Sequence, residues 1–119
     1  MEAGIKACKP GATENDIAAE ISSAMFKAGG EFPAVMPYVT TGPRTMIGHA
    51  TWEGRELQKG EHAFLEVGGC YRRYHTAMMR TVVTGELSDS MYKAQEVMKR
   101  ALEAVHEYYR PGLAISDAH

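Results

Sequence analysis

The stretch between Leu65 and Thr81 constrains the fold most, because it is typical of two adjacent strands joined by a turn. Alternating polarity with β-branched and aromatic residues predicts strands at residues 61–68 and 73–83, with a glycine-containing turn between them. Successive side chains of a strand lie on opposite faces. One face of the first strand therefore carries His62, Phe64 and Glu66, and the other carries Ala63, Leu65 and Val67. One face of the second strand carries His75, Ala77 and Met79.

Glu66 is the residue of chemical interest in this hairpin. Its neighbours in sequence are Leu65 and Val67, and burying a carboxylate among apolar side chains is unfavourable unless it has a partner. The residues alone leave two interpretations open. Glu66 pairs with a nearby arginine or faces water, or it is a functional group. The candidate arginines are Arg72, Arg73 and Arg80.

The residues before the hairpin predict two helices and an edge strand. Residues 1–9 suit the end of a helix, which Pro10-Gly11 stops. Thr13 and Asp16 form the pattern of a capping box at the start of a second helix, which ends at two glycines. Its expected apolar stripe consists of Ile17, Ile21, Met25 and Ala28. Residues 32–41 indicate an irregular edge strand, because two prolines interrupt it.

A long helix is expected after the hairpin. Ser88 or Asp89 caps its start, and Pro111-Gly112 stops it. Its apolar residues recur at helical spacing, which predicts a stripe facing the core. The stripe consists of Met91, Ala94, Met98, Ala101, Leu102 and Val105.

Three short motifs carry a resemblance to a known family. They are Gly60-Glu61, Glu66-x-Gly68 and Tyr74-x-x-Ala77-x-x-Arg80-Thr81. In this order they resemble the central hairpin of the creatinase and Xaa-Pro aminopeptidase family, whose pattern is Gly-Asp, Asp-x-Gly and Gly-Tyr-x-Ser-Asp-x-x-Arg-Thr. The resemblance implies an α+β fold. The expected architecture is half of a pita-bread fold, in which helices pack on one face of a curved, mostly antiparallel sheet.

The same resemblance bears on metal binding. In the family's peptidases, the two later aspartates of the pattern bind metal. Here Glu66 stands at the first position and Ala77 at the second, and an alanine side chain has no donor atom. The resemblance therefore implies no metal and no cofactor. A narrower resemblance, to the metal-free branch that includes ectoine hydrolase, rests on Glu66, on the residues Arg-Arg-Tyr-His at 72–75 and on His49-x-Thr51-Trp52.

The resemblance to the metal-free branch also suggests roles for individual residues. Glu66 is expected to be the catalytic nucleophile or base, and His49 to transfer the proton, because imidazole titrates near neutrality. Without the family pattern, a hydrogen-bonded histidine in a turn is the simpler interpretation of His49. His75 and Tyr74 are candidates for binding or orienting the substrate. Arg80 is expected to be structural and to anchor the hairpin through a carboxylate or a backbone carbonyl.

Composition limits the classes of partner and compartment. The chain has 119 residues. With the resemblance, we expect residues 1–119 to form a single partial domain, the first half of a pita-bread catalytic domain. The family's N-terminal domain and most of the second half of the catalytic domain are expected to be absent from it. A net charge of −2 with 24% charged residues favours neither nucleic acid nor a membrane surface as partner. There is no apolar run of membrane-spanning length and no signal-peptide pattern. Cys8 and Cys70 lack metal-ligand spacing and are expected to be free thiols in the cytoplasm.

The expected function is hydrolysis of a C–N bond in a small amide or cyclic amidine, by a larger enzyme of which this chain is a segment. Two alternatives remain open. One is a metal-dependent Xaa-Pro dipeptidase or aminopeptidase, in which Glu66 and ligands elsewhere hold one metal. The other is a non-catalytic relative that binds peptides or proteins. The segment alone is expected to be inactive and to form a homo-oligomer, with domain swapping as one route, because bare sheet edges and apolar faces associate.

Overall fold

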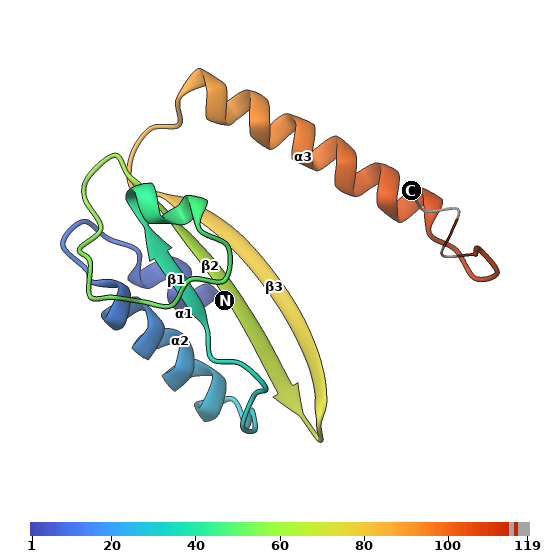
Figure 1. Cartoon of the computed structure of the whole chain (residues 1–119), viewed down its shortest axis with the longest axis horizontal. Helices are drawn as coiled ribbons and strands as arrows, with labels where there is room; N and C mark the ends of the chain where they lie inside the picture. The colour runs from blue at the N-terminus through green and yellow to red at the C-terminus, as the bar shows by residue number, and fades with distance from the viewer. Residues whose placement is uncertain (115, 117–119) are drawn as a thin grey trace. The chain divides into compact units, whose positions relative to one another are not determined.

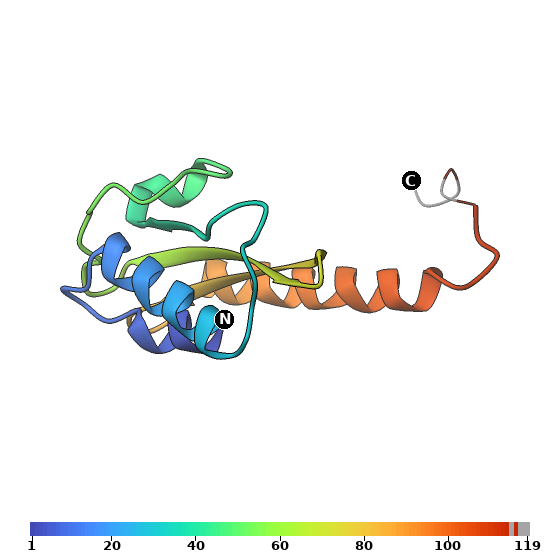
Figure 2. The same cartoon turned by 90° about the horizontal axis from the view of Figure 1, so that it is seen from below.

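The computed structural model describes residues 1–114 and 116, and the chain divides into two compact units, Met1–Glu86 and Leu87–His119. The first unit contains a three-stranded antiparallel sheet in the order β1-β2-β3 (Figure 1). The strands are β1 (Tyr38–Thr41), β2 (His62–Tyr71) and β3 (Tyr74–Val83). Helices α1 (Glu2–Ala7) and α2 (Glu14–Lys27) lie on one side of the sheet, and the 3-10 helix η1 (Gly42–Met46) lies on the other (Figure 2). The expected α+β class is confirmed.

The core lies between the two helices and β2. Burial alternates along β2 as expected, so that Ala63, Leu65 and Val67 are buried while the residues between them are partly exposed. Against these strand residues pack Ile17, Ala18 and Ile21 of α2, with Cys8, Val39 and Leu57. Burying an aliphatic side chain of this size stabilises the fold by about 1.5–3 kcal/mol. The buried stripe of α2 ends earlier than expected, because Met25 is only partly buried and Ala28 is exposed.

Helix α1 approaches this core closely because it carries a glycine at the contact. Gly4 is buried, and a Cβ atom at this position would lie 2.6 Å from Cγ1 of Ile21 and 3.2 Å from Cδ1 of Leu65. Helix α2 begins with the expected capping box. Thr13 accepts a hydrogen bond from the main-chain N–H of Asp16, and the Asp16 carboxylate accepts one from the N–H of Thr13. The box fixes the first turn of α2, including Glu14.

The turn of the hairpin differs from the expectation. A glycine-containing turn was expected after residue 68, but β2 continues through Gly68 and Gly69 to Tyr71, which pairs with Tyr74. The turn is the pair Arg72-Arg73, with φ of 47° and 67°. Two positive φ values match the twist of a two-residue hairpin loop, although glycine or asparagine usually occupies such positions. Contacts of the arginine side chains stabilise the turn. Arg72 lies over the Tyr71 ring at 5.6 Å, and Arg73 donates to Glu31 at 2.9 Å.

The segment expected to be an irregular edge strand forms a strand only at its end. Strand β1 covers four residues and pairs with β2, with Tyr38 opposite Glu66 and Thr41 opposite Ala63. The residues before it, which include Pro33, are not in a strand. Directly after β1 the chain enters η1, with a proline in its first turn.

The second unit contains α3 (Asp89–Tyr108), whose N-cap is Ser88. The Ser88 hydroxyl accepts a hydrogen bond from the N–H of Met91, so the expected cap is confirmed. No residue of α3 is buried within the second unit, so the expected core-facing stripe stays a prediction. Within residues 1–114 and 116, no helix combines the length and the apolar content that a membrane crossing needs.

Candidate active site on the sheet face opposite α1 and α2

Glu66 lies in the middle of β2, on the face that points away from the two helices. Its neighbours across the sheet are Tyr38 of β1 and Met79 of β3. The Glu66 side chain is 14% exposed, so it is largely shielded but still open to solvent. Its ionic partner is His49 and none of the three candidate arginines: Nε2 of His49 lies 3.4 Å from Oε1 of Glu66. The structure thus brings together the two residues expected to be catalytic.

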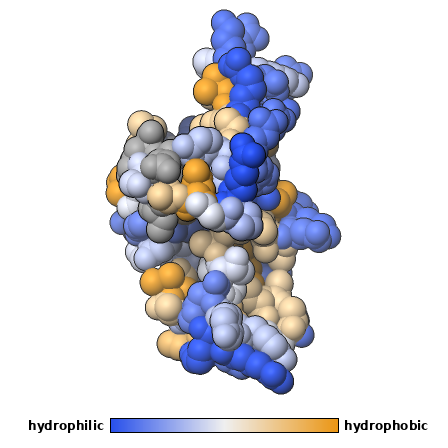
Figure 3. All heavy atoms as spheres, turned by 90° about the vertical axis from the view of Figure 1, so that its right-hand side faces the viewer, coloured by the Kyte–Doolittle hydropathy of each residue, from blue (hydrophilic) through white to orange (hydrophobic). Residues whose placement is uncertain are grey.

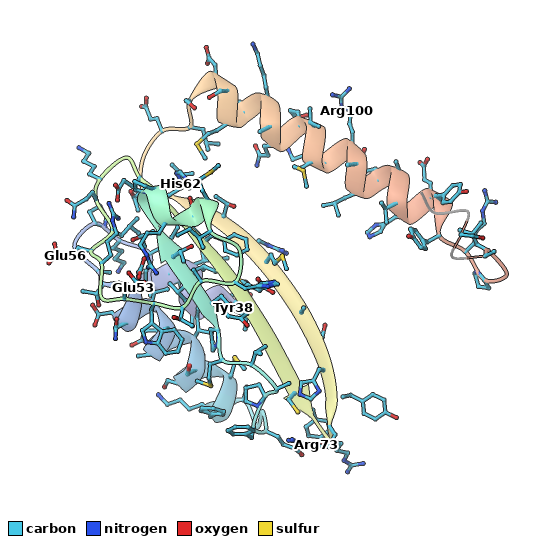
Figure 4. All side chains as sticks on the ribbon, in the orientation of Figure 1. Tyr38, Glu53, Glu56, His62, Arg73 and Arg100 are labelled. Carbon is cyan, nitrogen blue, oxygen red and sulfur yellow. The ribbon has the colours of Figure 1, made fainter. Side chains whose placement is uncertain are left out.

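The His49 ring is held between Glu66 and an aromatic neighbour. It stacks on the ring of Tyr38, with a centroid separation of 5.2 Å and an interplanar angle of 29°. Tyr38 lies beside the middle of the sheet (Figure 4). An offset stack of this kind adds about 0.5–1.5 kcal/mol beyond the area buried. Because Tyr38 also faces Glu66 across the sheet, one strand residue aligns both groups of the pair.

The backbone of His49 adopts an uncommon conformation. Its φ is 56°, in the left-handed region that side chains other than glycine seldom occupy. Such conformations cost about 1–3 kcal/mol, persist only where the surroundings impose them and cluster at functional sites. The His49 side chain is 69% exposed, so burial is not what holds it there. The strained backbone aims an open imidazole at Glu66.

The loop that carries His49 is also fixed at η1. Thr45 donates a hydrogen bond from its hydroxyl to the carbonyl of Gly42, at 2.8 Å. Nε2 of His62, at the start of β2, lies 2.7 Å from the same hydroxyl, so we assign the proton of this contact to the imidazole. His62 shares the face of Glu66 but lies four residues away along β2, which is about 13 Å at the usual rise.

His75 and Tyr74 lie at the opposite end of the hairpin from His62. His75 pairs with Cys70, also four residues from Glu66. Its Nε2 accepts a hydrogen bond from the N–H of Ala34 at 3.1 Å, and its Nδ1 lies 3.1 Å from the carbonyl of Arg73. His75 therefore shares the face of Glu66 as expected, but its two hydrogen bonds link the hairpin end to the segment before β1. Arg73 marks this end in Figure 4.

Tyr74 is 85% exposed and lines a hollow of about 660 Å³ at the hairpin end. The walls of this hollow include Met25, Gly30 and Cys70, and neither Glu66 nor His49 contributes to it. Arg80 donates to the carbonyl of Met79, its own neighbour in β3, at 2.6 Å. A structural Arg80 that contacts a backbone carbonyl was expected, but this bond lies within one strand and does not join β3 to another element.

The side chains near Glu66 do not fit a two-metal centre. The register sets Gly68 opposite Ala77, so the position two residues beyond Glu66 offers only a hydrogen atom and a methyl group. In the part of the chain that the structure describes, no three His, Cys, Asp or Glu side chains come together in a way that could hold a metal ion. The arrangement offers one carboxylate and one imidazole, which is a pair suited to proton transfer.

The two cysteines take no part in this site. Both are buried and free, as expected from their spacing. Burial raises the pKa of the Cys8 thiol to about 11, so it stays protonated and is a poor nucleophile at neutral pH.

Sequence reasoning missed two residues that shape the site. One is Tyr38, whose place on the Glu66 face follows from alternation along β1 once that short strand is located. The other is Glu14, which is fully buried. Glu14, Ile17, Ala18 and Ile21 follow the spacing i, i+3, i+4, i+7, so Glu14 falls on the buried stripe of α2. That pattern was visible in the sequence and could have shown that this carboxylate needs internal partners.

Comparison with protein families gives one match over the chain. The sequence profile of metallopeptidase family M24 matches residues 1–119. Among curated proteins, the ectoine hydrolase of Halomonas elongata is 34% identical over 89 residues, which cover 75% of this chain and 22% of that protein. The probable dipeptidase PepE of Mycobacterium tuberculosis is 33% identical over 105 residues, which cover 87% of this chain and 28% of that protein.

Solved structures show the same fold. The X-Pro aminopeptidase of Thermotoga maritima superposes with a TM-score of 0.77 at 27% identity, over 84% of this chain and 28% of that one. Aminopeptidase P of Escherichia coli superposes with a TM-score of 0.86 over 95% of this chain and 26% of that one, and at 24% identity this likeness concerns the fold alone. The chain thus spans about a quarter of the length of the relatives it matches.

Proposed function

Because the chain belongs to metallopeptidase family M24, a family of hydrolases and peptidases, we propose that it forms part of an enzyme that hydrolyses a C–N bond in a small amide or cyclic amidine without a metal ion. The observation that carries this proposal is the pair of His49 and Glu66, 3.4 Å apart on the open face of the sheet. The absence of a donor atom at Ala77 supports the metal-free part of the proposal. The similarity to an ectoine hydrolase supports the substrate class.

The pair supplies both proton transfers that hydrolysis needs. The Glu66 carboxylate removes a proton from water, whose oxygen attacks the carbon of the C–N bond. Protonated His49 donates its proton to the departing nitrogen as that bond breaks. The proton held by Glu66 then passes to His49 across their 3.4 Å separation, which restores both groups. If Glu66 instead attacks the carbon itself, His49 has the same role, and water later hydrolyses the intermediate.

A second candidate function has its own support. The similarity to PepE covers more of this chain than the similarity to ectoine hydrolase, 87% against 75%. In this alternative the enzyme is an Xaa-Pro dipeptidase or aminopeptidase. Glu66 then holds a single metal ion together with ligands from outside this chain.

The test uses a full-length protein that contains this chain, stripped of metal with a chelator and checked by elemental analysis. Ectoine-like cyclic amidines, simple amides and Xaa-Pro dipeptides are assayed with and without added manganese, zinc or cobalt. We expect metal-free turnover of an amide or amidine, and a loss in kcat of at least about 100-fold in Glu66→Gln and in His49→Asn. Asparagine suits the position because it tolerates positive φ but cannot transfer the proton.

The matched control is His106→Asn, which removes an exposed histidine of α3 and should leave kcat unchanged. Turnover that appears only with added metal and only on Xaa-Pro dipeptides would replace this proposal by the alternative. Near-normal kcat in either site variant would remove that residue from the mechanism.

The assembly and compartment remain part of the same proposal. We place the enzyme in the cytoplasm, which the two free cysteines support, because thiols persist in reducing compartments. We also expect it to act on a small molecule and to be a homo-oligomer.

A further inference from the structure

Glu14, the first residue of α2, is a fully buried carboxylate with an unusually complete set of donors. Its Oε1 accepts hydrogen bonds from the main-chain N–H of Thr41, at 2.8 Å, and from the Thr41 hydroxyl, at 3.1 Å. Its Oε2 accepts from the guanidinium of Arg44 and from the main-chain N–H of Glu53, at 2.8 Å. A buried charge is tolerated only when it is paired and hydrogen-bonded in this way.

These donors come from the two ends of one loop. Thr41 and Arg44 lie where the chain leaves β1, and Glu53 lies twelve residues after Thr41. Arg44 adds two further links to the far end, because it donates to the carbonyl of Thr51 at 2.8 Å and pairs with the Glu53 carboxylate at 3.1 Å. One carboxylate and one guanidinium therefore close the loop of residues 42–53, and His49 is in the middle of that loop.

The chain just beyond the loop is tied to the same end of α2. The main-chain N–H of Glu14 donates to the carbonyl of Arg55 at 2.9 Å, and the N–H of Leu57 donates to the carbonyl of Ala12, also at 2.9 Å. Two of the hydrogen bonds that Glu14 accepts come from main-chain N–H groups, so its carboxylate fixes backbone as well as side chains. Charge-assisted bonds of this kind are roughly twice as strong as neutral ones.

His49 needs such an external hold. Its left-handed backbone is intrinsically unfavourable and its side chain is mostly exposed. The preceding residue provides little packing, since a Cβ atom on Gly48 would meet nothing within 4 Å. With the loop ends released, the loop would relax and the imidazole would leave the Tyr38 ring.

We propose that Glu14 is a positioning residue for His49: by closing the loop of residues 42–53 with Arg44, it keeps the imidazole stacked on Tyr38 and next to Glu66. The catalytic consequence of this arrangement rests on the function proposed above, but the positioning itself does not. Glu14 lies on the opposite side of the sheet from the reacting groups, so it acts only through the loop.

The position of the His49 ring is measured by NMR on the isotope-labelled chain at one fixed pH well above neutrality. A stacked imidazole experiences the ring current of Tyr38, and Tyr38→Leu gives the reference for an unstacked ring. His49→Asn assigns the signals. We expect the His49 ring resonances in Glu14→Gln to move at least half of the way from the wild-type position to the Tyr38→Leu position. Glutamine carries no charge to pair with Arg44. If its N–H₂ group takes the place of Oε2, it also faces Arg44 and the N–H of Glu53 with a donor where they need an acceptor.

Two further variants separate positioning from general destabilisation. Ile21→Val removes a methyl group from the fully buried core, without touching the loop, and should leave the His49 resonances in place. Arg44→Lys keeps a positive charge beside Glu14 but loses the planar fork that also reaches Thr51, so it should shift the resonances in the same direction. If Glu14→Gln does not fold, Arg44→Lys decides. Wild-type His49 resonances in the folded variants would overturn the proposal.

The full-length protein provides the second measurement. Displacement of His49 by about an ångström should lower kcat about 10- to 100-fold in Glu14→Gln while KM changes little, and Ile21→Val should keep its kcat below its melting temperature. If the resonances move but kcat does not, Glu14 still positions His49, and it is the catalytic role of His49 that is overturned.

Discussion

Removing the Arg44 guanidinium should destabilise the first unit strongly, because the buried Glu14 carboxylate then loses the cation that hydrogen-bonds to it directly. The change is Arg44→Met, which keeps much of the side-chain length. Glu14 is fully buried and Arg44 is 16% exposed. Breaking a buried pair by removing one partner costs about 3–5 kcal/mol.

The contacts place the expected loss at the lower end of that range. Glu14 keeps three donors after the substitution, two from Thr41 and one from Glu53. Arg44 is also partly solvated in the native state, so its removal loses less than a fully buried group would. We therefore expect a loss of about 3 kcal/mol in the free energy of unfolding. For a unit of this size, that corresponds to a fall in melting temperature of about 12–24 °C.

Trp52 makes the measurement specific to the first unit. It is the only tryptophan of the chain and packs against the core of that unit. Urea titration followed by its fluorescence gives the free energy of unfolding for wild type and variant. The double variant Glu14→Gln/Arg44→Met should recover part of the loss, because no charge is then left unpaired.

A matched control uses an ion pair on the surface. Arg73 pairs with Glu31 at 2.9 Å, but their side chains are 61% and 40% exposed. Exposed pairs of this kind contribute about 0–1 kcal/mol, so Arg73→Met should be nearly neutral by comparison. A loss below about 1 kcal/mol in Arg44→Met, no larger than in the control, would refute the reasoning that Glu14 depends on its guanidinium.

Two further predictions concern acid stability and association. Arg55 donates two hydrogen bonds to Glu61 and lowers the pKa of that carboxyl from 4.5 to about 2. The stability that this pair contributes is therefore complete above pH 4.5 and is lost as the pH falls toward 2. Glu61→Gln should flatten this part of the plot of stability against pH, and an unchanged acid profile would contradict the prediction. The chain in isolation should self-associate at micromolar concentration, because β3 is an edge strand with Met78 and Met79 exposed. Figure 3 also shows apolar surface among polar residues. Light scattering that gives the mass of one chain would contradict this prediction.

Local rules were enough to predict most of the secondary structure. The capping box at Thr13 and the Ser88 cap are contacts within one turn of helix, and both are confirmed. The alternation that places Glu66 and Leu65 on opposite faces of β2 is equally local. Such patterns depend on residues a few positions apart, so a single sequence contains the information they need.

The predicted position of the hairpin turn was wrong for a physical reason. The sequence predicts the turn at the glycines, since glycine adopts positive φ without a side-chain penalty. The register instead runs both glycines into β2 and puts positive φ at Arg72 and Arg73. The link from Arg73 to Glu31 joins residues 42 positions apart, and no pattern within the hairpin contains that contact.

The backbone conformation of His49 shows most clearly what the sequence could not reveal. A reader of Gly48-His49 would assign a left-handed backbone to the glycine, but φ is 56° at the histidine. This choice is made by contacts far away in the sequence: Tyr38 stacks on the ring, and Glu14 closes the loop from a helix 35 residues earlier. Because the local preference opposes the observed conformation, the pairing of His49 with Glu66 must be maintained by tertiary structure. The histidine and the glutamate are therefore visible in the sequence as candidates, whereas the arrangement that makes them a pair depends on two residues that no motif contains.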